Sequence, residues 1–159
     1  MNAVLMVLLV VVSAAVQAML TGIWPRLTMV FDLPLVIVIY CAIAKGPTGA
    51  LLAGAGAGLV QDALEGTLLG VSALSKTLVG YLVGVVGLRF ALAPLMSRVL
   101  VLASATVLTR SIELGTLAIM GRRLAYSPYP TLLVTILGNC LVGAMVFGLL
   151  PGRPAEARP

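Results

Sequence analysis

Histidine is absent from this 159-residue chain, and charged residues make up only 9% of it. Without histidine, the chain lacks the commonest general base and the commonest transition-metal ligand. Its two cysteines, Cys41 and Cys140, lie far apart within apolar runs, so they predict neither a disulfide framework nor a zinc site. No nucleophile elbow or phosphate-binding glycine loop is present. These absences predict a protein that is not an enzyme and that carries no catalytic residue, metal or cofactor.

Apolar residues, by contrast, are abundant and form 61% of the chain. Ordinary soluble domains contain about 25% charged residues, and a soluble domain of this length could not bury so much apolar surface. Several segments approach or exceed the roughly 20 apolar residues that span a bilayer as a helix. The composition therefore predicts an integral membrane protein with one domain.

Six apolar runs predict six transmembrane helices, at residues 3–20, 35–44, 49–64, 68–88, 95–120 and 131–150. The second and third runs are short. The second rises only about 18 Å even when residues 33 and 34 are included, and the third rises about 24 Å. A hydrocarbon core is about 30 Å thick. These two runs form either a hairpin of short spans or a re-entrant hairpin, and we expect the crossing form.

The fold class is therefore all-α, a polytopic helix bundle over residues 1–150. A proline-rich polar tail at residues 151–159 has nothing to bury and is expected to be disordered. The run at 3–20 could also be a signal peptide, because Val16-Gln17-Ala18 loosely resembles a cleavage site. No Lys or Arg precedes that run, so we expect a span.

The net charge of +5 comes from cations that flank the apolar runs rather than from a basic face, which predicts lipid and not nucleic acid as the partner. With six spans, both termini lie on one side, and so do five of these cations: Lys45, Arg89, Arg98, Arg153 and Arg158. The opposite side has three: Arg26, Arg122 and Arg123. The positive-inside rule then predicts cytoplasmic termini and an external interfacial anchor made by Arg122, Arg123, Tyr126 and Tyr129.

Glycines recur at helical spacing along the third and fourth predicted spans. Three pairs have the GxxxG spacing: Gly54 with Gly58, Gly66 with Gly70, and Gly80 with Gly84. In lipid, close backbone approach is a main source of helix association, and small residues permit it. The pattern predicts that these two spans pack tightly as an antiparallel hairpin.

Charged residues extend both glycine faces. Asp62 and Glu65 continue the face of the third span, and Lys76 lies on the face of the fourth, which would place Asp62 near Lys76. Pairing matters because a lone charge in hydrocarbon costs at least about 2.5 kcal/mol. Two alternatives are open: Asp62 accepts hydrogen bonds from amides of the adjoining loop, or it is wetted at the interface.

Arg110 lies near the middle of the fifth predicted span, and Glu113 follows it at i+3, the spacing that brings two side chains together on a helix. An ion pair inside a membrane is a functional-site hypothesis by default. The alternative is a structural pair that locks this span into the bundle.

Residues 32–90 contain the pattern G-L-x-x-D-x-x-x-G-x-x-L-G-x-x-A-L, which begins at Gly58 and has Asp62 as its acid. Pro34 and Lys45-Gly46-Pro47 precede it, and Gly80-Tyr81-Leu82 follows it. In these motifs the chain resembles the MreD family of bacterial rod shape-determining membrane proteins. One departure is Asp32-Leu33-Pro34, where the proline is expected to precede the acid.

The resemblance implies a non-catalytic inner-membrane subunit of the cell-elongation machinery that supports peptidoglycan synthesis. Such proteins bind MreC, a single-span protein, and act near RodA, its transpeptidase partner and MreB. The family is also similar in fold to the S components of energy-coupling vitamin transporters.

Three functions remain open at this stage. The chain could be a scaffold whose glycine-lined grooves accept partner helices. It could instead be a small-solute binding subunit in which Arg110 and Glu113 hold a polar ligand, or a pore or flippase-like subunit. A solute site needs several convergent polar groups, and their scarcity here favours the scaffold.

Overall fold

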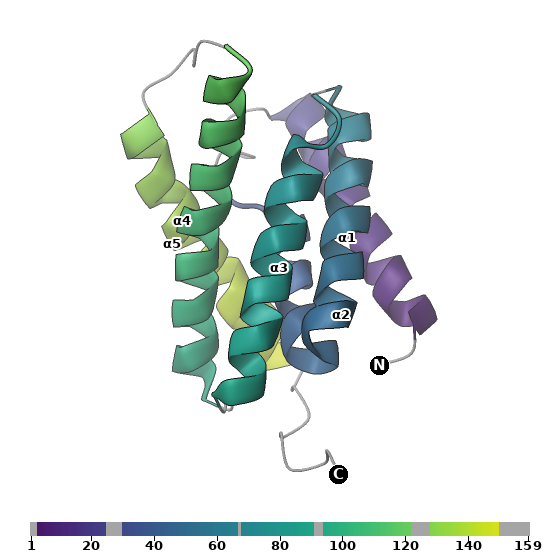
Figure 1. Cartoon of the computed structure of the whole chain (residues 1–159), viewed down its shortest axis with the longest axis vertical. Coiled ribbons are helices and arrows are strands. Elements are labelled where there is room, and N and C mark those ends of the chain that lie inside the picture. The colour runs from purple at the N-terminus through teal and green to yellow at the C-terminus, as the bar shows by residue number, and fades with distance from the viewer. Residues whose placement is uncertain (1–2, 25–29, 67, 91–93, 122–127, 150–159) are drawn as a thin grey trace.

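The computed structural model describes residues 3–24, 30–66, 68–90, 94–121 and 128–149. Within these residues the chain forms five α-helices and no strand (Figure 1). The helices are α1 (Ala3–Ile23), α2 (Leu33–Glu65), α3 (Val71–Arg89), α4 (Leu95–Ile119) and α5 (Pro128–Leu149). All five are long and apolar enough to cross a membrane, so the predicted helical membrane bundle is confirmed.

The described residues form five helices where six were predicted, because the runs at 35–44 and 49–64 follow each other without a loop and together make up α2. This helix is broken at Gly46, whose φ of 78° and ψ of −168° are not helical. Glycine adopts a positive φ without steric cost. Pro47, which has no backbone N–H, begins the next turn. The break divides α2 into a first limb, residues 33–45, and a second limb, residues 47–65.

The two limbs of α2 fold back against each other. Ile37, Val38 and Cys41 of the first limb share one hydrophobic cluster with Ala53 and Ala57 of the second. The chain therefore reverses direction at the break, at the lower end of the bundle in Figure 1. The expected hairpin is present, although its limbs are unequal, with rises of about 20 and 28 Å.

The first limb is short because it begins inside the bundle. The backbone N–H of Asp32 donates to Oδ1 of Asn139 over 2.7 Å. Asn139 lies eleven residues after Pro128 and ten before Leu149, about 16 Å from either end of α5. Residues 30–32, the lead-in segment, thus reach the middle of the bundle without helical structure before α2 starts.

Glycines allow the second limb of α2 and α3 to approach backbone to backbone. A Cβ added at Gly54 would lie 2.5 Å from the carbonyl oxygen of Lys76, and one at Gly58 would collide with the backbone of Ala73. From the other side, a Cβ at Gly84 would lie 2.5 Å from Cα of Pro47. This antiparallel contact agrees with the close packing that the GxxxG spacing predicts.

Gly80 makes room for both limbs of α2 at once. A Cβ at this position would lie 2.7 Å from Cγ1 of Val38 and 3.0 Å from the carbonyl oxygen of Ala50. Because α3 packs into the angle between the two limbs here, the glycine helps to hold the hairpin closed.

The third GxxxG pair has a different role from the one its spacing suggests. Gly66 ends α2 with φ 64° and Gly70 precedes α3 with φ 103°, and a Cβ at either position would have no atom within 4 Å. These two glycines therefore form the turn between the helices and are not packing residues. Their positive φ values are the reason for glycine at both positions.

The first residues of α1 and the last residues of α5 lie at the same end of the bundle (Figure 1), because the reversal within α2 adds one pass to those of the five helices. The predicted external anchor and the predicted tail at 151–159 consist of residues outside the described ranges. The side chains that are not described include those of Arg26, Arg122, Arg123, Tyr126 and Tyr129.

Candidate functional site

Asp62 is buried near the end of α2 and holds the turn that leads into α3. Its Oδ2 accepts hydrogen bonds from the backbone N–H groups of Gly70, at 2.8 Å, and Ser72, at 3.2 Å. The first N–H groups of a helix have no partner within the helix, and Gly70 has no side chain to cap them. A carboxylate from the neighbouring helix therefore caps α3 and also meets the positive end of its dipole. This geometry corresponds to the alternative in which Asp62 binds loop amides.

Lys76 is fully buried on α3, and its closest carboxylate is Asp32 rather than the expected Asp62. Nζ of Lys76 lies 2.8 Å from Oδ2 of Asp32 and 3.9 Å from Oε1 of Glu113. Asp32 precedes the predicted second span at 35–44 and was not predicted as a partner of Lys76. Because the lead-in segment reaches the middle of the bundle, Asp32 lies where the ammonium needs an anion.

Asp32 also starts the first limb of α2. Its Oδ1 accepts a hydrogen bond from the backbone N–H of Leu35 at 3.0 Å, while its Oδ2 pairs with Lys76. Aspartate is a favoured N-cap residue, and proline, here Pro34, is favoured in the first helical turn. One carboxylate thus caps a helix inside the membrane bundle and neutralises a buried cation.

Two side-chain amides satisfy the backbone of the lead-in segment. Gln17 of α1 accepts from the N–H of Leu33 at 3.2 Å and donates to the carbonyl of Phe31 at 3.1 Å. Asn139 of α5 accepts from the N–H of Asp32 and donates to Oγ1 of Thr106 at 3.0 Å. Non-helical backbone at membrane depth is tolerated only where protein or water satisfies it. These amides provide the partners that a helix would otherwise supply.

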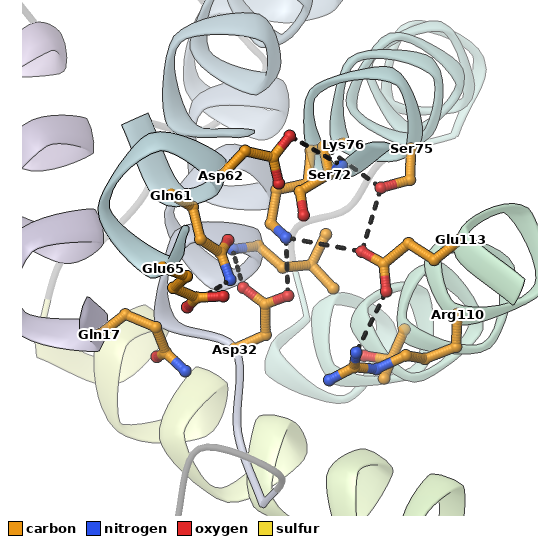
Figure 2. Close-up of polar contacts among 12 residues, drawn as sticks. Gln17, Asp32, Gln61, Asp62, Glu65, Ser72, Ser75, Lys76, Arg110 and Glu113 are labelled. Atoms are coloured by element: carbon orange, nitrogen blue, oxygen red, sulfur yellow. Dashed lines mark hydrogen bonds and ion pairs between the residues drawn. The ribbon is translucent and has the colours of Figure 1, made fainter. Parts of the chain in front are cut away.

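The predicted pair of Arg110 and Glu113 is present on α4. Nη1 of Arg110 lies 3.1 Å from Oε2 of Glu113. The other oxygen of Glu113, Oε1, accepts from the hydroxyl of Ser75 at 3.2 Å and faces Lys76. Figure 2 shows the resulting order of charges, Arg110, Glu113, Lys76 and Asp32, which we call the charge chain.

The charge chain alternates in sign and contains two cations and two anions, so it is formally neutral. It joins α4 to α3 and α3 to the start of α2. A buried charge without a partner is strongly destabilising, whereas a balanced group can be held inside a bundle. The arrangement therefore locks three elements at one depth.

The remaining candidates lie around this centre. Glu65, at the end of α2, accepts a hydrogen bond from Nε2 of Gln61 at 3.1 Å. Gly54, Gly58, Gly80 and Gly84 all lie in the contact between α2 and α3 described above. Within the described ranges, no three His, Cys, Asp or Glu side chains are grouped so that they could hold a metal ion.

Asp32 was not predicted to belong to the site, and Gln17 and Asn139 were predicted only as polar side chains that supplement the Arg110–Glu113 pair, not as partners of residues 31–33. One signal for Asp32 was available, since an acid two residues before a proline at the start of an apolar run marks a helix N-cap. Gln17 and Asn139 are single amides within apolar runs, and an amide in lipid needs a polar partner. Nothing in the linear sequence indicated that both would bind residues 31–33.

A helical bundle whose second helix starts at mid-depth beside a buried, neutral charge chain defines a polytopic membrane protein with a polar structural centre. A comparison with family models matches residues 1–152 to the family described as rod shape-determining protein MreD. The chain belongs to the MreD family. Neither the curated proteins nor the solved structures contain a significant match. The fold similarity to S components of energy-coupling transporters thus stays a prediction.

Proposed function

We propose that this chain is a non-catalytic scaffold of the bacterial cell-elongation machinery, which binds MreC in the inner membrane and supports peptidoglycan synthesis. Membership of a rod shape-determining family supports this role. RodA, its transpeptidase partner and MreB are the further components that we expect nearby. Both termini are proposed to be cytoplasmic.

This proposal rests on one observation: the buried polar side chains bind other groups of the same chain. Asp32, Lys76, Glu113 and Arg110 pair with one another, and Asp62 binds backbone amides. Groups engaged in this way define the shape of a bundle and are not arranged around a substrate. This internal pairing supports a role in which a fixed shape is presented to partners.

The glycine-lined faces of α2 and α3 are not available to a partner helix, because their glycines already pack against each other's helix within the chain. A partner helix must therefore bind a different surface. Helix α1 offers more free surface. Among the described helices it contacts α2 alone, and Val4, Val7 and Val11 are exposed on it. Such a face suits lipid and the single span of MreC.

Asp62 provides the test of this proposal, because it shapes the turn at one end of the bundle. Asp62→Asn keeps a side-chain oxygen that can accept hydrogen bonds from the backbone N–H groups of Gly70 and Ser72. Asp62→Ala removes this acceptor, so both N–H groups lose the bond. We expect near-normal MreC co-purification and rod shape for the asparagine variant. For the alanine variant we expect a clear loss of both, since an unsatisfied buried group costs about 1–3 kcal/mol.

Glu65→Gln serves as the matched control, because it removes a nearby carboxylate charge without touching the turn amides. Cells whose only copy of this protein is the variant should show the difference in shape, and membranes from the same cells supply the co-purification. Full MreC recovery and normal shape with Asp62→Ala would contradict the proposed role of this end of the bundle.

Orientation can be measured with cysteines placed in exposed turns at opposite ends of the bundle. Leu69, between α2 and α3, is 71% exposed, and Phe90, after α3, is 65% exposed. In a background with Cys41→Ala and Cys140→Ala, we expect an impermeant maleimide to label Leu69→Cys in intact spheroplasts. Phe90→Cys should react only after permeabilisation, because Lys45, Arg89 and Arg98 favour the cytoplasm at that end. The opposite pattern would show that the termini are external.

A solute-binding subunit is the second candidate, favoured by one observation. Helix α2 begins at mid-depth beside charged groups, and transporters commonly build their sites from such broken helices. A saturable rise in melting temperature with a vitamin or metal, in protein that fails to recover MreC, would favour this function over the scaffold.

A further inference from the structure

Lys76 lies between two carboxylates that compete for one ammonium group. Its Nζ contacts Asp32 at 2.8 Å and stands 3.9 Å from Glu113, and its side chain is 1% exposed. A movement of about 1 Å would bring the ammonium from hydrogen-bonding distance of Asp32 to hydrogen-bonding distance of Glu113, which is about 2.8 Å for a charged pair. Lys76 would keep an anionic partner throughout. The geometry thus offers Lys76 two alternative positions.

Glu113 is held away from Lys76 by its other partners. Oε2 is engaged by Arg110 at 3.1 Å, and Oε1 accepts from Ser75 at 3.2 Å. With Arg110 neutralising Glu113, the ammonium of Lys76 is drawn to Asp32. If Arg110 turned to another anion, Glu113 would become the stronger attractor for Lys76.

Arg110 is the end of the charge chain that can be reached from outside it. Its side chain is 35% exposed, compared with 13% for Glu113 and 6% for Asp32. A guanidinium has five N–H donors in a planar fork, and the contact found among the described residues is with Glu113 through Nη1. Donors therefore remain for an incoming carboxylate or carbonyl.

We propose that the charge chain is a relay in which Lys76 is exchanged between Asp32 and Glu113, and in which an acceptor group on a partner's membrane segment operates it at Arg110. In the structure described here the relay holds Lys76 on Asp32. Engagement of Arg110 moves Lys76 to Glu113 and leaves Asp32 without its cation.

The consequence of that exchange is release of the lead-in segment. Asp32 caps the first limb of α2 through the N–H of Leu35, and the segment itself is held by Gln17 and Asn139. An Asp32 carboxylate without Lys76 is unstable inside the bundle and draws toward water at the outer end of the segment. The start of α2 then loosens, so that engagement of Arg110 on α4 changes the structure at residues 30–36.

The relay can be tested in the isolated chain by hydrogen–deuterium exchange in nanodiscs, followed by mass spectrometry of peptides that cover residues 30–36. Arg110→Gln removes the competing cation and should raise exchange of the Asp32 and Leu35 amides on the order of tenfold, within the usual range for coupled sites. Glu113→Gln removes the alternative partner and should leave this exchange at the wild-type level.

The double variant Arg110→Gln/Glu113→Gln is decisive. A relay predicts that it returns to wild-type exchange, because Lys76 then has Asp32 as its carboxylate. A purely structural chain predicts additive loosening, or none from Arg110→Gln, and either result would overturn the relay. Ser111→Ala is the control on α4, since its exposed hydroxyl donates to the carbonyl of Val107 on the same helix.

A second measurement in the same samples separates local release from misfolding. Peptides that cover Gly54 and Gly58 report the α2–α3 contact, and their exchange should not change in the Arg110→Gln variant. A rise there equal to the rise at residues 30–36 would also overturn the relay. The relay rests on the scaffold proposal only for the identity of the partner that engages Arg110. If MreC binding were normal but Arg110→Gln did not raise amide exchange at residues 30–36, the relay alone would be rejected.

Discussion

Replacing Lys76 with methionine should lower the free energy of unfolding by about 3–5 kcal/mol, the usual cost of removing one partner of a buried ion pair. Methionine is unbranched and only one atom shorter than lysine, so most of the packing of this buried side chain is kept. Asp32 is then left in the bundle without the cation at 2.8 Å, whereas Glu113 keeps Arg110. The effect should appear as a lower midpoint of thermal unfolding in detergent.

The loss should be partly reversed in the double variant Lys76→Met/Asp32→Asn. Asparagine removes the unpaired charge and is itself a good N-cap, so the bond to the N–H of Leu35 can persist. Arg89→Met, at the exposed end of the same helix, is the control and should change stability little. A double variant no more stable than Lys76→Met would show that Asp32 is not the partner that matters.

Replacing Gly58 with leucine should separate α2 from α3 and also cost several kcal/mol. Overpacking alone usually costs about 1–3 kcal/mol, and here the new side chain meets backbone rather than flexible side-chain atoms. A Cβ at this position collides with Cα and N of Ala73, which cannot move without shifting α3. Because α3 carries Lys76, the displacement should also disturb the charge chain. Thermal unfolding and MreC co-purification measure the two effects.

Gly115→Leu is the matched control, because a Cβ added to this exposed glycine of α4 would have no atom within 4 Å. It makes the same chemical change in another membrane-spanning helix and should leave the melting temperature almost unaltered. Equal losses for the two variants would mean that general helix properties, and not the α2–α3 contact, explain the effect of Gly58→Leu.

The class of fold followed from composition and spacing because these are local properties. In lipid, the backbone N–H and C=O groups of a long apolar run must bond within the protein, and a helix achieves this within the run itself, whatever its neighbours are. Helix count was the exception, since Lys45-Gly46-Pro47 looked like a connection between two helices. The structure has a sharp break there, with no intervening loop, because one glycine with positive φ is enough to reverse the chain.

Interactions between residues close in sequence were also predictable. Arg110 and Glu113 are three positions apart on one helix, so helical geometry brings them together almost independently of the rest of the fold. Asp62 is eight residues from Gly70, within one helix–turn–helix unit, and its bond to that amide was one of the alternatives considered. The Gly54 and Gly58 contacts with α3 belong to the same hairpin.

The sequence by itself therefore determined a helical membrane bundle, the α2–α3 hairpin and the ion pair on α4. Only the tertiary structure decided which anion neutralises Lys76, because the choice depends on how deeply residues 30–32 enter the bundle. That depth is set by Gln17 and Asn139, which are far apart in sequence and bind the same few backbone groups. A buried charge is paired by proximity in three dimensions, and no local pattern encodes the distance between Asp32 and a lysine 44 residues later.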